Sequence, residues 1–347
     1  MSEREQNGLR GLVKTCVDER SYPAASAGDG TELPERKYSY STEYDVAGHI
    51  IETRSGESSG KDWVTRNTYD GSGRLLKRAW GKDGGPLHEA IYTYDAQGRL
   101  LNTRGPGNTD SSSFHYDEHG RKTKVQVSRA EDYKPNVGIA GSPFESADQA
   151  PNLPGGGTAT TIYDENDRPN EIQVRNADGE LVTRALRTYD SQGRVSDEKQ
   201  IMESMAALMP AAQLQKILDE SGASREQFQQ ELTRLMGGHD GPTAMGYTYD
   251  SQGRVKEMHR RIFNEDEHTE ITYNDHGDKL AEIMRTTKLG GDEAEQNTPG
   301  PPSYNETVYS YRYDTHGNWT EQTVSWRSTP DGALQKSTVT RRTLTYY

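Results

Sequence analysis

The chain has 347 residues, a net charge of −13 and a hydrophobic content of only 30%. This balance disfavours nucleic acids and anionic membranes as partners, because binding to phosphates needs clustered Lys and Arg. The sequence holds no apolar run long enough to span a bilayer. Its single cysteine, Cys16, excludes an internal disulfide framework and a cysteine-cluster metal site.

Tyrosine dominates the aromatic residues, with 20 Tyr against 4 Phe and 4 Trp. A mean hydropathy of −1.02 leans toward disorder, but disordered chains are usually poor in aromatic residues. Tyrosine combines a large apolar ring with a polar end, which suits surfaces that are half buried and half wet. We therefore expect a folded protein with a thin core.

Residues 1–36 precede the regular pattern of the sequence, and we expect them to form an N-terminal lead-in segment. They lack the apolar stretch of a secretory signal, so they carry no export address. A misplaced start or a fragment of a longer protein would have the same appearance.

From residue 37 onward one motif recurs, in which Tyr is followed by Asp or Asn, two variable residues and usually Gly. Its nine copies begin at Tyr44, Tyr69, Tyr94, Tyr116, Tyr163, Tyr189, Tyr249, Tyr273 and Tyr313. Short alternating segments before each copy, rich in β-branched and aromatic residues, predict strands. Asp is favoured at the first position of a type I turn, and Gly three residues later supplies the positive φ of the hairpin loop.

Each repeat is therefore predicted to be a β-hairpin. The structural turn residues are Asp45, Gly48, Asp70, Gly73, Asp95, Gly98, Asp117, Gly120, Asp190, Gly193, Asp250, Gly253, Asp314 and Gly317.

This pattern resembles the YD-repeat, or Rhs (rearrangement hot spot), family of bacterial proteins, over about residues 36–347. The resemblance implies an all-β fold in which antiparallel β-hairpins add side by side into a curved or spiralling sheet. It also implies an extracellular or cell-envelope protein, in a family whose members take part in adhesion or carbohydrate binding. Large members enclose a C-terminal toxin. This chain lacks the Asp-Pro-x-Gly-Leu segment that ends their cores, so that role does not carry over.

Two stretches interrupt the repeats. Residues 133–158 are rich in Pro and Gly, which predicts an exposed loop between repeats at 37–132 and 159–199. Residues 200–238 are predicted to form a small α-helical hairpin insertion, before the last repeats at 239–347. Its helical signals are the spacing of Met202, Met205, Leu208 and Met209 and the capping-box pattern of residues 224–227.

The sequence shows no convincing catalytic motif, and we expect a protein that is not an enzyme, with no catalytic residues, no metal ligands and no cofactor. An Asp that recurs in almost every repeat is explained by turn geometry, whereas a catalytic pair of carboxylates would be singular. His119, His276 and His316 recur just before the turn glycine, which favours exposed turn residues over metal ligands.

Tyrosines that alternate along a strand are the better candidates for binding, because alternate residues share one face. The candidate ligand platform consists of Tyr92, Tyr94, Tyr247, Tyr249, Tyr309, Tyr311, Tyr313 and Trp319. Two interpretations stay open. The rings either form the thin core through cross-strand pairs or present a platform to sugar rings.

Three hypotheses about function follow. The first is a non-enzymatic repeat scaffold at the bacterial cell envelope that binds a polysaccharide or a partner protein. The second is a carbohydrate-active hydrolase with two loop carboxylates in a concave pocket. The third is a fragment of a larger Rhs-type protein.

The turn interpretation generates a stability prediction for the third copy. Asp95→Ala removes an acceptor for backbone N–H groups, so we expect the free energy of unfolding to fall by about 1 kcal/mol, as on losing a helix cap. Gly98→Val should cost more, because a β-branched residue opposes a positive φ. Equal or higher melting temperatures for both variants would show that the hairpin assignment is wrong.

Overall fold

The computed structural model describes residues 1–26, 32–57, 62–106, 110–130, 144–145, 152–204, 206–209, 211–235, 243–262, 265–288 and 302–347. The chain divides into two compact units. Unit 1 consists of Met1–Tyr92, Ile271–Met284 and Tyr304–Tyr347, and unit 2 of Thr93–Glu270 and Arg285–Ser303.

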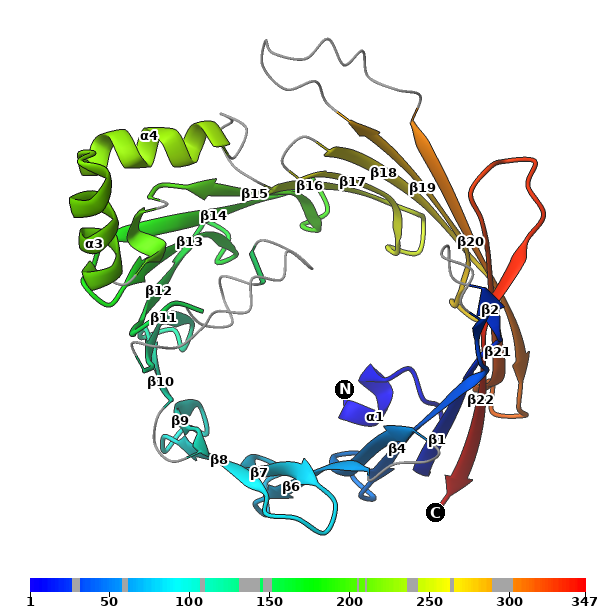
Figure 1. Ribbon diagram of the computed structural model, residues 1–347. Helices are drawn as coiled ribbons and strands as arrows, with labels where there is room; N and C mark the ends of the chain where they lie inside the picture. Colours follow the sequence, from blue (N-terminus) through cyan, green and yellow to red (C-terminus); the bar gives the residue numbers. More distant parts are fainter. Residues whose placement is uncertain are drawn as a thin grey trace. The chain divides into compact units, whose positions relative to one another are not determined.

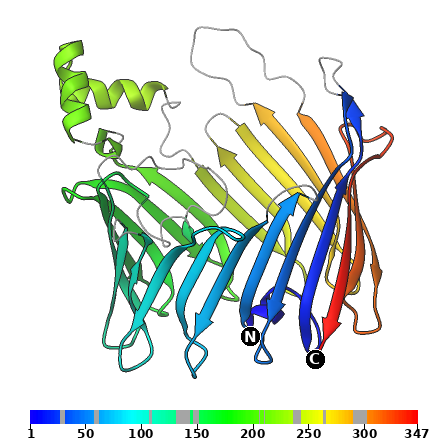
Figure 2. The same cartoon turned by 60° about the horizontal axis from the view of Figure 1, so that its bottom comes forward.

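Antiparallel strands dominate both units, and neighbouring strands alternate in direction (Figure 2). The strands are β1 (Val13–Tyr22), β2 (Ala25–Ser26), β3 (Glu32–Leu33), β4 (Arg36–Tyr44), β5 (Ile50–Glu57), β6 (Trp63–Tyr69), β7 (Leu75–Lys82), β8 (His88–Tyr94), β9 (Leu100–Arg104), β10 (Ser111–Tyr116), β11 (Lys122–Ser128), β12 (Gly156–Tyr163), β13 (Pro169–Asn176), β14 (Leu181–Tyr189), β15 (Val195–Met202), β16 (Thr243–Tyr249), β17 (Val255–Ile262), β18 (Glu265–Tyr273), β19 (Lys279–Lys288), β20 (Ser303–Tyr313), β21 (Trp319–Arg327) and β22 (Gln335–Tyr346). The helices are α1 (Glu3–Gln6), the 3₁₀-helix η2 (Ala206–Leu208), α3 (Ala211–Ser221) and α4 (Arg225–Leu235). The expected antiparallel all-β class is confirmed.

The predicted turn residues all lie in hairpin turns of one geometry. At the third copy the Gly98 N–H donates to the Asp95 carbonyl at 3.0 Å, and the Asp95 N–H donates to the Arg99 carbonyl at 2.9 Å. Gly98 has a φ of 81°. In the fifth copy Asp167 takes the place of this glycine and still adopts a φ of 62°. The positive φ therefore belongs to the loop, and Gly meets it without steric cost.

The side chain of each turn Asp holds its loop together. In the Arg-containing loops, one carboxylate oxygen accepts the backbone N–H groups of the second and fourth following residues at 2.8–3.0 Å. Where the fourth following residue is Arg, its Nε donates to the other oxygen at 2.6–2.9 Å. The Arg side chain is thereby fixed in direction, because Asp anchors its planar guanidinium.

In unit 2 this Arg links each hairpin to the next. Its guanidinium carbon lies 4.3–4.8 Å from the ring centroid of the following motif tyrosine, in the pairs Arg99–Tyr116, Arg121–Tyr163, Arg168–Tyr189 and Arg194–Tyr249. The same tyrosines donate their hydroxyl hydrogens to the backbone carbonyls of Leu100, Lys122, Pro169 and Val195 at 2.6–2.8 Å. We call this arrangement of turn carboxylate, guanidinium and ring the Asp–Arg–Tyr interlock.

In unit 1, tyrosines stack on histidine where the loop lacks the motif Arg. His49 stacks on Tyr69 with ring centroids 4.8 Å apart, and Tyr69 donates to the Ile50 carbonyl at 2.8 Å. His276 stacks on Tyr313 at 4.0 Å in the turn whose Arg position holds Asp278. His49 occupies the Arg position itself, whereas His276 lies two residues after the turn residue Asn274. Each histidine supplies the ring contact that the missing Arg cannot make.

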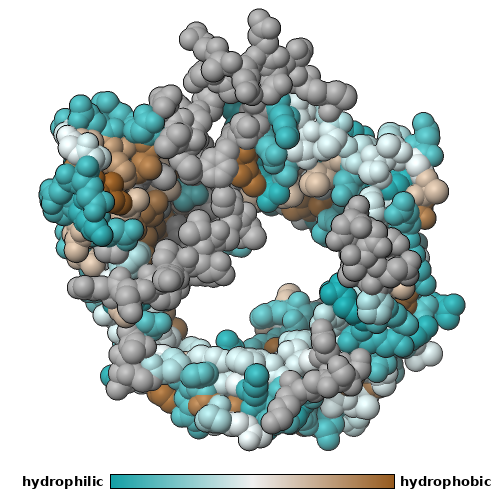
Figure 3. Space-filling view, viewed as in Figure 1, coloured by the Kyte–Doolittle hydropathy of each residue, from teal (hydrophilic) through white to brown (hydrophobic). Residues whose placement is uncertain are grey.

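The largest apolar core of the described residues lies in unit 2. Its buried members are Val125, Val127, Phe144, Leu153, Ala159, Ile172, Val174, Val182, Ala185 and Ala207. The helices α3 and α4 lie beside β12–β15 (Figure 1), and apolar surface gathers next to them (Figure 3). Seven of these ten residues belong to strands β11–β14, and Phe144, Leu153 and Ala207 from the segments between strands add to their apolar cover.

The helical insertion begins later than its sequence pattern indicates. Met202 ends β15, so the helical spacing inferred from that residue is wrong at its start. Met205 lies outside the described residues. The capping box forms at α4, where the Gln227 N–H donates to Ser224 Oγ at 3.1 Å and the Ser224 N–H donates to Gln227 Oε1 at 2.9 Å.

Most of the Pro/Gly-rich stretch 133–158 lies outside the described residues, but its last residues belong to β12. A Cβ on Gly156 would stand 2.1 Å from the Val127 carbonyl oxygen, and one on Gly157 would stand 2.1 Å from the Arg175 carbonyl oxygen. These glycines are required by the close approach of neighbouring backbones, rather than by a loop.

One expectation about the sheet is corrected in unit 1. A curved or spiralling sheet leaves its first and last strands as edges. Here β1 pairs with β22 on one side and with β4 on the other, so the start of the chain joins its last strand to its first repeat. The edge of the array is paired at this point, which removes exposed N–H and C=O groups that would recruit other strands.

Acid should weaken the hairpin turns. The Arg74 backbone N–H holds the pKa of Asp70 below its ordinary value, and the Arg168 guanidinium does so for Asp164. At Asp190 desolvation opposes the shift, but bonds from Arg194 still lower the pKa. Because these pKa values are lower in the folded state, the stabilisation is present above the unfolded pKa of ~3.9 and lost as pH falls through the folded value.

We therefore expect the melting temperature to stay level between about pH 7 and pH 5 and to fall below about pH 4. Asp190→Asn keeps an acceptor oxygen without a titrating group, so its melting temperature should fall less over the same interval. A wild-type melting temperature that holds or rises down to about pH 2 would contradict the turn account.

Candidate ligand-binding site

The strands β1, β4 and β22 carry two pockets in unit 1. Arg20 of β1 faces Tyr38 of β4, and Ser21 faces Lys37. Successive side chains of a strand point to opposite faces. Arg20 and Tyr22 therefore lie on one face of these strands and Ser21 lies on the other, and each face has one pocket at this end of β1.

The first pocket is a tyrosine cup of about 420 Å³, lined by Asp18, Arg20, Tyr22, Tyr38, Ser39, Tyr40, Ser55 and Gly56. Tyr22 and Tyr38 meet edge to face, with ring centroids 5.7 Å apart and planes at 87°. Tyr40 is 48% exposed, a large fraction for an aromatic side chain inside a concave surface. The volume of the cup falls within the ~300–1,000 Å³ that is typical of small-molecule sites.

The charges of the cup are not equivalent. Both carboxylate oxygens of Asp18 accept from Arg342, with Nε and Nη2 each at 2.8 Å, and the guanidinium carbon of Arg342 lies 3.4 Å from the Trp319 ring centroid. The charge of Asp18 is thus neutralised by Arg342 in a half-buried bidentate ion pair. Arg20 has no ion-pair partner within the described part of the chain, so it presents the charge that a ligand can use.

A buried apolar cluster lies further along the same three strands. It contains Leu9, Val13, Cys16 and Tyr44. Burial raises the pKa of the Cys16 thiol to about 12, so the group is a protonated thiol at neutral pH and packs as a small apolar side chain. This cluster fixes β1 between its neighbours and so supports the cup.

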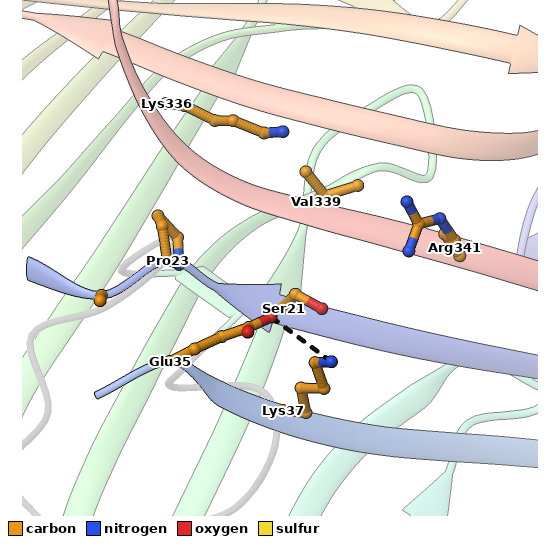
Figure 4. Close-up of a pocket in the computed structure, with 8 residues that line it drawn as sticks. Ser21, Pro23, Glu35, Lys37, Lys336, Val339 and Arg341 are labelled. Carbon is orange, nitrogen blue, oxygen red and sulfur yellow. Dashed lines mark ion pairs between the residues drawn. The ribbon is translucent and has the colours of Figure 1, made fainter. Parts of the chain in front are cut away.

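The second pocket, which we call the cationic pocket, lies on the opposite face of β1 and encloses about 380 Å³. Figure 4 shows residues that line it. It is lined by Ser21, Pro23, Ala24, Glu35, Lys37, Lys336, Val339 and Arg341. The Lys37–Glu35 ion pair measures 3.5 Å between highly exposed groups, and Arg341 Nε lies 3.2 Å from Glu321. Three cations thus surround one lining carboxylate.

The first residues of the chain hold unit 1 together near these strands. Glu3 accepts the Ile50 N–H at 2.7 Å. Arg10 donates to the carbonyls of Gly317 and His276, each at 3.0 Å. The expected lead-in segment thus ties turns from both ends of the repeat pattern, which explains how β1 reaches β22.

The predicted tyrosine platform is distributed over β8, β16, β20 and β21, and all eight of its residues are half-buried. Five of its hydroxyls donate within the protein, to Glu198 from Tyr247, the Val195 carbonyl from Tyr249, Glu282 from Tyr309, the Lys279 carbonyl from Tyr311 and Asp278 from Tyr313. The Trp319 ring is covered by Arg342. These contacts assign most of the rings to packing between hairpins.

Sequence reasoning missed the cup because its residues come from both sides of the expected boundary between the lead-in segment and the repeats. Tyr22 lay in the expected lead-in segment, whereas Tyr38 and Tyr40 opened the repeats. The alternation of Tyr38 and Tyr40 was a usable signal, but nothing in the motif pairs β1 with β4. The stacking of His276 and His316 on tyrosines was also missed. Both lie in loops that lack the motif Arg, and that correlation was available in the sequence.

Comparison with known proteins found a family match and a similarity to a solved structure. The RHS Repeat family matches residues 91–130, which contain the third and fourth copies of the motif. This match confirms the expected resemblance to the YD-repeat, or Rhs, family over these residues. Among solved structures, the chain is similar to a porin-like protein from Bacteroides uniformis, with a TM-score of 0.33 and 10% identity over 96% of each chain. No curated protein matches the sequence. None of the described helices combines the length and apolar character needed to cross a membrane.

Proposed function

We propose that this protein is a non-enzymatic repeat scaffold that binds carbohydrate through the tyrosine cup. The observation that carries the proposal is a concave pocket lined by three tyrosines, one of them 48% exposed, beside the guanidinium of Arg20, which has no ion-pair partner among the described residues. Aromatic faces accept the apolar faces of sugar rings, while nearby polar groups bind the hydroxyls. Ser55, which faces Tyr40 in the register, adds such a polar group to the lining.

The charge arrangement favours binding over hydrolysis. Glycoside hydrolysis uses two carboxylates that flank the scissile bond. The cup has one lining carboxylate, Asp18, whose two oxygens are both engaged by Arg342. A single carboxylate whose two oxygens both accept from Arg342 does not form the flanking pair that hydrolysis requires.

We also propose that the protein acts at the bacterial cell envelope or outside the cell. This part of the proposal rests on the RHS repeat at residues 91–130 and on the usual location of proteins in the family that the chain resembles. The acidic net charge of −13 fits a polysaccharide or protein partner better than a nucleic acid.

The proposal predicts that purified protein binds one or more glycans on an array, and that the cup supplies the affinity. In a titration with the best glycan, Tyr40→Ala should weaken binding about fivefold, the equivalent of losing ~1 kcal/mol of ring contact. Tyr92→Ala is the matched control, since it removes a half-buried tyrosine of the predicted platform. Each variant is first checked for an unchanged circular dichroism spectrum.

Three results would contradict the proposal. Silence across the array would remove carbohydrate as the ligand. A loss of affinity in Tyr92→Ala with none in Tyr40→Ala would move the binding surface away from the cup. Release of reducing ends from the bound glycan would show instead that the protein is a hydrolase.

A further inference from the structure

We infer that the cationic pocket is a second binding site, which takes the phosphate group of a phosphorylated sugar or a phosphorylated polymer unit. It is distinct from the tyrosine cup, because it lies on the opposite face of β1. The observation behind it is a gathering of Lys37, Lys336 and Arg341 in one concavity of a protein with a net charge of −13.

The pairing of β1 with its two neighbours creates this gathering. Ser21 lies opposite Val339 of β22 and opposite Lys37 of β4. Lys336 and Arg341 lie along β22 on one side of Ser21, and Lys37 lies on its other side (Figure 4). Residues almost 300 positions apart in the sequence therefore share one pocket. Like charges brought together in this way repel each other unless an anion joins them.

The cations differ in how firmly they are already engaged. Arg341 contacts Glu321 at 3.2 Å and also faces Glu19 in the register. Lys37 contacts Glu35 at 3.5 Å, but both side chains are more than half exposed, at 60% and 53%. Such exposed pairs contribute only ~0–1 kcal/mol. Lys336 has no ion-pair partner in the described ranges. Lys336 is therefore the group from which a ligand gains most.

The lining indicates the chemistry of the ligand. Ammonium groups act as point charges that suit phosphate oxygens, and the Ser21 hydroxyl adds a neutral donor. Val339 and Pro23 supply an apolar wall. A volume of about 380 Å³ lies within the range of small-molecule sites, so the pocket has room for the phosphate together with the group that bears it.

The test uses the full chain, titrated by calorimetry at low ionic strength with inorganic phosphate, glucose 1-phosphate and glucose. We expect both phosphates to bind, with glucose 1-phosphate the tighter, and glucose to give no signal from this pocket. Lys336→Gln should weaken the binding of glucose 1-phosphate about fivefold, the equivalent of one lost exposed charge contact. Binding should also weaken as salt rises, because the site is open to solvent.

Two control variants make the test specific. Lys77→Gln removes the same charge from another exposed strand lysine, which pairs with Glu89 at 3.0 Å, and it should leave the affinity unchanged. Tyr40→Ala alters the cup on the other face and should also leave it unchanged. The inference is overturned if neither phosphate binds, if Lys77→Gln weakens binding as much as Lys336→Gln, or if Tyr40→Ala abolishes it. The Tyr40→Ala comparison uses inorganic phosphate, which offers no sugar ring to the cup, so its outcome does not depend on whether the cup binds a glycan.

Discussion

The fold depends on what the turn carboxylate does for the hairpin that follows it. In each Arg-containing loop, Asp accepts two backbone N–H groups and orients the Arg side chain. In unit 2 that Arg covers the next motif tyrosine, whose hydroxyl returns to the backbone beside the Arg. A chain with 30% hydrophobic residues cannot rely on aliphatic burial alone. The repeated interlock supplies order where the core is thin.

Much of this could be predicted from the sequence, because turns are local. Asp and Gly at a fixed spacing identify the loops, and alternation before them identifies the strands. The interlock itself was not predicted, since the contact of Arg168 with Tyr189 joins two repeats. The same limit hid the role of His276, which becomes a stacking residue only where Asp278 has replaced the Arg. Contacts between repeats need the strand order, which periodicity does not provide.

The candidate sites were the least predictable part, because they arise where the pattern stops. β1 contains no copy of the motif, yet it pairs with both β4 and β22. That pairing gathers three tyrosines on one face and three cations on the other. The platform tyrosines were the first candidates, but five of their hydroxyls donate hydrogen bonds within the protein. The tyrosines and cations of the two candidate sites belong to β1 and the strands beside it, where the repeat pattern is interrupted.

A double-mutant cycle at Arg168 and Tyr189 tests the interlock most directly. The free energy of unfolding is measured for wild type, Arg168→Met, Tyr189→Leu and the double variant. The interlock predicts a coupling energy of about 1 kcal/mol between the two sites, from the cation–π contact and the fixed ring. Arg168→Met combined with Tyr249→Leu, whose ring stacks on Arg194 instead, should be additive. A coupling energy indistinguishable from zero at Arg168 and Tyr189 would contradict the account.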